Sequence, residues 1–295
     1  MIELAIVSGK GGSGKTTLAS SLAFLFNREG FRIVVADTDV DTPSLHFLLQ
    51  LEEVLSSSEM KLSRKASIEE IQCLKCMKCV NACQFYAINV NHEFPEIDRY
   101  LCEGCGTCKI VCPSDAIRIE EASTGKLTVG VSTYGFPFIT AQLELGEHNS
   151  GALVNEVKNK AREIALSSNS RVILIDGAPG IGCPVISTLV GVNYAIIVTE
   201  PTPASEDGAR RILEVAKHFK VKSGFIVNKA DISQYREHVT RTLQEQGSEY
   251  MGDIPFDFSV VKALSEGKPV VAYNSSASKA IQEIFHKLME VINEF

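Results

Sequence analysis

The stretch GKGGSGKTT (residues 9–17) and the segments on either side of it limit the possible folds more than any other part of the chain. The apolar run Ile2–Gly9 predicts a buried strand, and the residues after the stretch show helical periodicity up to Gly30. A second strand, rich in β-branched residues, is expected over Phe31–Asp39. Strand, helix and strand in this order predict a βαβ unit and therefore a parallel sheet.

The loop has the spacing G-x-x-x-x-G-K-[ST], which is typical of phosphate binding when it follows a strand and opens a helix. Its glycines let backbone N–H groups surround phosphates, and the helix N-terminus adds a favourable dipole. We therefore expect ATP here, with Lys15 on the β- and γ-phosphates and the Thr16 hydroxyl on Mg²⁺. The alternative is a glycine-rich turn without a ligand. The expected nucleotide-binding residues of the loop are Gly9, Gly11, Gly12, Ser13, Gly14, Lys15, Thr16 and Thr17.

A second lysine, Lys10, stands near the start of the loop. With it, KGGSGKT resembles the deviant phosphate loop of the MinD/ParA/nitrogenase iron protein class of ATPases. In that class the early lysine crosses a dimer interface to the partner's nucleotide. The resemblance therefore implies a homodimer, or a heterodimer with a paralogue, in which Lys10 stabilises charge on the partner's transferring phosphoryl group. The alternative is a solvated loop lysine.

Two aspartate-rich stretches extend the resemblance. ADTDVDTPSL (36–45) resembles the first switch of these ATPases, with Asp39 at the position that orients water and Mg²⁺. Asp37 and Asp41 lie close by and remain alternatives for this role. DGAPG (176–180) follows a predicted strand and resembles the second switch, which implies that Asp176 belongs to the Mg²⁺ shell. Both Asp39 and Asp176 are thus expected to be catalytic beside Lys10 and Lys15, the alternative being helix-cap or turn aspartates.

Weaker matches concern the base of the nucleotide. The resemblance implies that Asn228, in NKAD, contacts the base. It also implies that IPFD (254–257), which includes Pro255, and EGKP (266–269) close the adenine pocket. Short strings of this kind also occur by chance.

The α/β pattern stops near Glu52 and resumes with strands expected over 127–132, 171–177, 194–200 and 222–228. Neither flank alone has enough strands for a complete sheet. We therefore expect one doubly wound α/β domain with a mainly parallel sheet, formed by residues 1–60 and 122–295 and interrupted by a small inserted domain over 61–121. The last apolar-periodic segment, 280–295, has an acidic, mixed polar face, which favours packing on the sheet over membrane binding.

Eight of the nine cysteines lie within the expected insertion, in two copies of C-x₂-C-x₂-C-x₃-C. The second copy follows the first by 29 residues, since 102 − 73 and 112 − 83 agree. This is the spacing of bacterial two-cluster ferredoxins, in which the fourth cysteine of each motif binds the other cluster. The expected ligands are Cys73, Cys76, Cys79 and Cys112 for a first [4Fe–4S] cluster, and Cys102, Cys105, Cys108 and Cys83 for a second. Structural zinc, which usually uses two C-x₂-C pairs separated by a longer arm, is the alternative.

The two motifs differ around their cysteines. The second has Gly104 and Gly106, which permit close backbone approach, and we expect Lys75 and Lys78 at these positions of the first. The ninth cysteine, Cys183, follows the second switch, where the nitrogenase iron protein has a cluster ligand. It is either one half of a transient metal or cluster site between subunits, or a small buried residue before Pro184.

Composition narrows the partners. A net charge of −7 disfavours nucleic acid and bare membrane surfaces. No apolar run approaches the ~20 residues of a membrane span, and no signal peptide is apparent, so we expect a cytoplasmic protein without stable membrane association.

The combination of motifs resembles MinD-superfamily ATPases of archaea and anaerobes with an inserted ferredoxin domain. The resemblance implies ATP hydrolysis in a dimer, coupled either to electron transfer to a redox partner or to cluster delivery to an apo-protein. Permanent ligation by four cysteines per cluster favours electron transfer.

Overall fold

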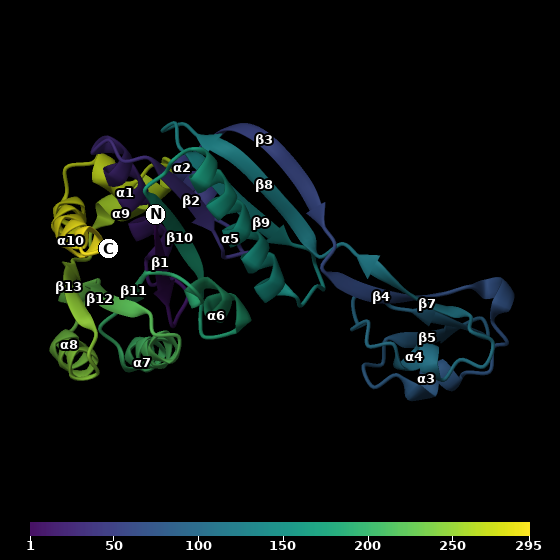
Figure 1. The fold of residues 1–295 in the computed structure, drawn as a ribbon. Coiled ribbons are helices and arrows are strands. Elements are labelled where there is room, and N and C mark those ends of the chain that lie inside the picture. The colour runs from purple at the N-terminus through teal and green to yellow at the C-terminus, as the bar shows by residue number, and fades with distance from the viewer. The chain divides into compact units, whose positions relative to one another are not determined.

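The computed structural model describes residues 1–295 and divides them into two compact units (Figure 1). The large unit contains Met1–Ser57, Leu127–Gln142 and Val154–Phe295. The small unit contains Ser58–Lys126 and Leu143–Leu153. The expected insertion, residues 61–121, falls inside the small unit, but the association of 143–153 with it had no signal in the sequence.

A nine-stranded sheet forms the centre of the large unit, in the order β13-β12-β11-β1-β10-β2-β9-β8-β3. Every neighbouring pair from β13 to β9 is parallel, which confirms the expected α/β class. The strands are β1 (Ile2–Ser8), β2 (Ile33–Asp37), β3 (Leu51–Met60), β8 (Gly125–Ser132), β9 (Pro137–Leu143), β10 (Val172–Pro179), β11 (Tyr194–Thr199), β12 (Lys222–Asn228) and β13 (Glu249–Ile254).

Helices cover this sheet, and several begin at sequence-encoded caps. Thr202 and Ser275 accept a backbone N–H at the starts of α7 and α10, and Asp257 does so for α9, as short polar side chains do at helix N-termini. The helices are α1 (Lys15–Arg28), α2 (Leu45–Leu49), α5 (Ser150–Ser167), α6 (Cys183–Leu189), α7 (Pro203–His218), α8 (Tyr235–Glu245), α9 (Phe258–Ser265) and α10 (Ser276–Asn293). None is long and apolar enough to cross a membrane.

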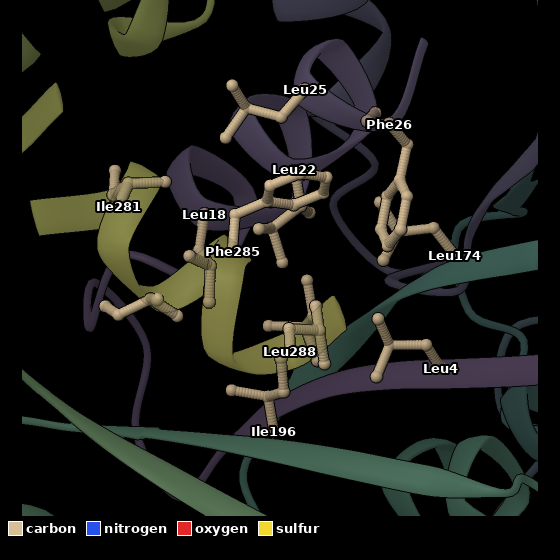
Figure 2. Packing of buried hydrophobic residues seen from close by; sticks show 14 of the residues in the cluster. Leu4, Leu18, Leu22, Leu25, Phe26, Leu174, Ile196, Ile281, Phe285 and Leu288 are labelled. Atoms are coloured by element: carbon tan, nitrogen blue, oxygen red, sulfur yellow. The ribbon is translucent and has the colours of Figure 1, made fainter. Parts of the chain in front are cut away.

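The main core lies where α1 and α10 meet one face of the sheet. Figure 2 shows Leu22 and Phe26 of α1 and Phe285 and Leu288 of α10 gathered with strand residues such as Leu174 and Ile196. The rings of Phe26 and Phe285 meet edge to face, with 4.9 Å between centroids. The prediction that the last segment packs on the sheet is confirmed, because its apolar stripe is buried in this core.

The edge strand β3 is absent from the expected pattern, which broke off near Glu52. Residues 52–59 of this strand are exposed, so its sequence shows neither an apolar run nor the alternation of a strand with one buried face. β9 was also unexpected, although it pairs in parallel with β2.

The small unit has two antiparallel ladders, which pair β4 with β7 and β5 with β6. Their bounds, with two short helices, are β4 (Ser63–Ile68), α3 (Lys78–Ala82), β5 (Ile88–Asn91), β6 (Phe94–Ile97), α4 (Thr107–Ile110) and β7 (Ile117–Ala122). Its core contains three buried cysteines among aliphatic side chains: Cys79, Cys102 and Cys108.

The sequence repeat is also a backbone repeat. Positive φ angles recur 29 residues apart, at Lys75 (52°) and Gly104 (64°), and at Met77 (57°) and Gly106 (80°). The expectation that Lys78 matches Gly106 is therefore wrong. Lys78 is the first residue of α3, where the backbone is helical.

Candidate functional site

The glycine-rich loop lies between the end of β1 and the start of α1. Gly12 and Gly14 have φ angles of 77° and 98°, a region that other residues avoid. Gly9 is fixed by packing, because a Cβ there would lie 2.3 Å from the Cα of Gly208 in α7. The loop therefore needs glycine at these positions for its own shape, and its backbone N–H groups precede a helix N-terminus, as phosphate binding requires.

Lys15, Asp39 and Asp176 lie close enough to interact electrostatically at the carboxyl edge of the sheet. This follows from the strand order, in which β10 lies between β1 and β2. The Lys15 side chain is buried, and burial lowers the pKa of its ammonium group while Asp176 and Asp39 raise it. The structure thus brings together the lysine and the two aspartates predicted from separate motifs.

Asp37 has a different role from Asp39. Its carboxylate accepts backbone N–H groups from Asp39, Ser44 and Leu45 at 3.1 Å each, and it is fully buried. Asp37 therefore holds the turn of the first switch and the start of α2.

Asp41 is exposed, whereas Asp39 is half-buried and interacts electrostatically with Lys15. Burial raises the pKa of Asp39, and hydrogen bonds from Thr42 lower it. Of the three aspartates considered, Asp39 is thus the half-buried one, and it lies within electrostatic range of Lys15.

Asp176 is fully buried, and its Oδ1 has no hydrogen-bond partner. Burial raises its pKa to about 7, against the opposing effects of a hydrogen bond with Thr16 and the charge of Lys15. A buried carboxylate oxygen without a partner is unfavourable unless something else neutralises it. With the Thr16 hydroxyl beside it, this donor set fits a hard cation such as Mg²⁺.

Lys10 lies on the exposed side of the loop. Its Nζ is 3.8 Å from Glu200, whose side chain is nearly buried, while the Lys10 side chain is half exposed. Lys229 holds the same carboxylate at 2.5 Å. Lys10 is thus held within its own chain by a single long ion pair, whose lysine end is half exposed.

A cavity of about 280 Å³ adjoins the loop. Pro255, Phe256, Val260 and Leu264 line it, together with Asn228. The Asn228 amide donates to the Ser13 carbonyl at 2.7 Å, and its oxygen accepts the Lys229 backbone N–H. Asn228 therefore also braces the glycine-rich loop, a task its sequence context did not indicate.

In the small unit, two separate cavities are each lined by four cysteines. One has Cys73, Cys76 and Cys79 of the first motif with Cys112 of the second. The other has Cys102, Cys105 and Cys108 with Cys83. Backbone N–H groups approach several of these sulfurs, for example Ala66 to Cys102 at 3.4 Å and Ala116 to Cys112 at 3.3 Å.

No group of three or more histidine, cysteine, aspartate or glutamate side chains in the chain is arranged to hold a single metal ion. A single zinc ion needs four ligands about 2.0–2.3 Å from one centre. A four-iron cluster instead takes one thiolate on each iron, so its ligands surround a larger body. Each cavity offers four cysteine thiols, the number of ligands that such a cluster takes.

Cys183 is exposed at the start of α6. The interpretation of this cysteine as a small buried residue is therefore wrong. The proline after it, Pro184, occupies a first-turn position that suits proline, because no N–H is needed there.

Comparison with known proteins assigns most of the chain to one family of nucleotide-binding domains. Residues 4–270 match the family described as "CobQ/CobB/MinD/ParA nucleotide binding domain". The chain belongs to this family. A protein of Methanocaldococcus jannaschii, uncharacterized protein MJ0578, is 35% identical over 294 residues, which cover 99% of this chain and 98% of the relative.

Two further relatives of the family are informative. The iron-sulfur cluster carrier protein of the same organism is 22% identical over 306 residues, covering 98% of this chain and 84% of the relative. Among solved structures, the septum site-determining protein MinD from Pyrococcus horikoshii, complexed with Mg-ADP, shares the fold with a TM-score of 0.56 and 18% identity, over 97% of this chain and 95% of that one. The expected family membership and nucleotide-binding fold are thus confirmed.

Residues that the sequence did not single out complete the nucleotide site. Gly208 has no side chain and so allows the backbone of Gly9 to lie against it. Glu200 forms ion pairs with both Lys10 and Lys229. The Lys229 Nζ also donates to the Gly12 carbonyl at 3.4 Å. Lys229 lies directly after Asn228, in the NKAD string already considered. Glu200 directly follows β11, at the same carboxyl edge of the sheet as the loop. Its position after a predicted strand could have indicated that it belongs to the site.

Proposed function

We propose that this protein is an ATPase whose nucleotide-dependent switching in a dimer is coupled to electron transfer through two [4Fe–4S] clusters. The observation that carries the proposal is the pair of four-cysteine cavities, each with three ligands from one motif and the fourth from the other. In bacterial two-cluster ferredoxins this pattern of thiolates holds two clusters, with the fourth cysteine of each motif bound to the other cluster. The expected domain of 61–121 is accordingly proposed to be a bacterial-type ferredoxin domain within the small unit.

At the nucleotide site, each proposed role follows from placement. The loop N–H groups from Gly9 to Thr17 and the Lys15 ammonium would hold the ATP phosphates. Thr16 and Asp176 would bind Mg²⁺, which supplies charge neutralisation at the phosphates when bound. Asp39 would orient the attacking water, and the cavity beside Asn228 and Pro255 would receive the base.

Lys10 is proposed to act on the partner's nucleotide. Its ion pair with Glu200 is long and half exposed, so releasing it costs little, and Lys229 remains to neutralise Glu200. The proposal includes a homodimer, or a heterodimer with a paralogue, as the active form.

Electrons need a donor and an acceptor. We propose that a low-potential one-electron donor protein reduces one cluster, and that a one-electron acceptor protein oxidises the other. The clusters supply one-electron storage when bound. The chain's own contribution is to hold them close together in one small core, with Cys76 and Cys105 exposed at the surface.

A second candidate is delivery of an iron–sulfur or other metal cofactor to an apo-protein. Two observations favour it: Cys183 is exposed directly after the second switch, and one relative is named an iron-sulfur cluster carrier protein. In a dimer, the Cys183 thiolates of the two subunits would together form a transient site that binds a metal or cluster loosely.

One anaerobic experiment separates the candidates. The reconstituted protein is reduced, supplied with Mg-ATP and mixed with an oxidised one-electron acceptor protein or with an apo-ferredoxin. Electron transfer that needs ATP, with iron retained on the chain, supports the first proposal. Iron appearing in the apo-ferredoxin supports the second, and Cys183→Ser should then stop it. A reconstituted chain that holds no iron and sulfide contradicts both.

A further inference from the structure

A buried lysine lies directly against a proposed ligand of the second cluster. The Lys65 Nζ donates to the Cys102 carbonyl at 3.0 Å and lies 3.0 Å from Glu147 Oε1. The side chains of Lys65 and Glu147 are only 7% and 9% exposed. Two charges removed from water in this way are costly unless they are paired and hydrogen-bonded, so each depends on the other staying in place.

The first cluster has no equivalent of this pair. The repeat of 29 residues places Phe94 opposite Lys65, since 94 − 65 is 29. The residues that follow this pair also differ. The Ala66 N–H donates to the Cys102 sulfur, whereas Pro95, 29 residues later, has no N–H to donate. Ala66 and Pro95 line the corresponding cysteine cavities. Only Cys102 is therefore held at both its carbonyl and its sulfur by residues of β4.

Glu147 belongs to a short segment, Glu144–Asn149, that we call the strap. Three further hydrogen bonds fasten the strap to the rest of the small unit. The Glu144 N–H donates to the Thr124 carbonyl, the Ser123 hydroxyl donates to the Glu144 carboxylate, and the Asn149 amide donates to the Leu62 carbonyl. These contacts and the Lys65 pair hold the strap within the small unit.

The chain on either side of the strap continues into elements that support the two switches. Before it, β9 pairs with β2 in parallel, with Thr140 opposite Asp37 at the start of the first switch. After it, α5 carries the buried Lys158, which donates to the carbonyls of Ser187, Thr188 and Val190 at the end of α6. α6 follows the second switch. Each switch is therefore connected to the strap through one strand or one helix.

From these contacts we propose that Lys65 is a positioning residue for the second cluster, and that the strap transmits the state of the nucleotide site to it through Glu147. The inference rests on the proposed function, because it requires a cluster at Cys102. When the strap shifts, Glu147 leaves Lys65, and an uncompensated ammonium group remains beside Cys102. A positive charge at this distance favours the reduced, more negative cluster, so its potential rises.

The test is an anaerobic redox titration, followed by electron paramagnetic resonance, of the reconstituted protein with Mg-ADP and with a non-hydrolysable ATP analogue. We expect one of the two midpoint potentials to change between the nucleotides and the other to stay constant. In Glu147→Gln, the nucleotide-sensitive cluster should already have the higher potential and should lose its response. Glu144→Gln is the matched control, since it removes a strap carboxylate that does not touch Lys65, and it should keep the response.

Hydrogen–deuterium exchange of residues 143–149 in the wild-type protein gives a readout that needs no variant. Exchange in this segment should differ between the two nucleotides. If two clusters are bound but neither the potentials nor this exchange depends on the nucleotide, the link is refuted while the proposed function stands. If the reconstituted chain binds no clusters, the proposed function is refuted. Nucleotide-dependent exchange of the strap would then still support a link between the nucleotide site and the strap.

Discussion

Asp176→Asn should make the metal-free protein more stable at neutral and alkaline pH while removing its response to Mg²⁺. The carboxyl group has an ordinary pKa of 3.8, and burial raises it to about 7 in the folded chain. Between these values the folded protein keeps a proton that the unfolded chain has released, so stability falls as pH rises. The difference corresponds to about 4 kcal/mol, at about 1.36 kcal/mol per pKa unit.

The sign of this contribution fixes the pH window. Below about pH 4 both states are protonated and the buried carboxyl costs nothing, whereas above about pH 7 the whole cost is present. An asparagine has no charge to bury and removes repulsion with the neighbouring Asp37. Anaerobic urea unfolding of metal-free wild type and Asp176→Asn should therefore give similar stabilities at pH 4, and a variant that is more stable by a few kcal/mol at pH 8.

Mg-nucleotide should reverse this order. A cation that binds the folded wild type adds stability as RT ln(1 + [L]/Kd), about 2.7 kcal/mol at a hundredfold excess over Kd. Asp176→Asn should gain little, because its amide cannot replace a carboxylate toward Mg²⁺. Asp257→Asn is the control of opposite sign: hydrogen bonds from Ala277, Ser259 and Ser276 hold the pKa of Asp257 well below its usual value, so this change should destabilise the protein at pH 8. Equal stabilities of wild type and Asp176→Asn at pH 8, with an undiminished Mg²⁺ effect in the variant, would refute the reasoning.

Three further changes test separate parts of the structure. Lys10→Ala should leave ATP binding and the melting temperature unchanged, because the ion pair of Lys10 is half exposed. The same change should stop hydrolysis in a phosphate-release assay. Rapid hydrolysis by this variant would contradict action on the partner's nucleotide. Gly208→Ala should destabilise the large unit by about 1–3 kcal/mol, because the added Cβ would lie 2.8 Å from the Cα of Gly9, and thermal unfolding should show it unless the loop shifts freely. Cys83→Ser should cost the cluster held by Cys102, Cys105 and Cys108, leaving the other spectroscopically intact, whereas loss of the first motif's cluster would exclude cross-ligation.

The sequence predicted best what depends on short, local patterns. β1, β2 and β10 are nearly continuous apolar runs, as strands covered on both faces must be, and the turns after them carry the glycines and aspartates of the site. Because parallel strands present their carboxyl ends on one edge, the strand order then brings Lys15 and Asp176 together. The distinction between Asp37 and Asp39 was beyond this reasoning, since it depends on which carboxylate the backbone N–H groups of Ser44 and Leu45 reach.

The strap shows why the rest was not predictable. Its sequence, ELGEHN, has neither the periodicity of an element nor the spacing of a motif. What ties it to the rest of the small unit is one buried ion pair, one exposed contact between His148 and Glu103, and a few hydrogen bonds to residues 20 or more positions away. Contacts of that kind leave no trace in a single sequence, because each partner is an ordinary polar residue until the fold places it.

The two lysines of the loop differ in how firmly their own chain holds them. Lys15 is buried among Asp37, Asp39 and Asp176, and leaving that position would strand buried carboxylates without a counter-charge. The Lys10 ammonium group forms an ion pair with Glu200 at 3.8 Å, and Glu200 is also paired with Lys229 at 2.5 Å. One lysine is therefore fixed at the proposed phosphate site of its own chain, and the other can reach outward at little cost. A loop with this division is suited to a nucleotide site completed by a second subunit, so the electrostatics of the loop support the proposed dimer as its sequence does.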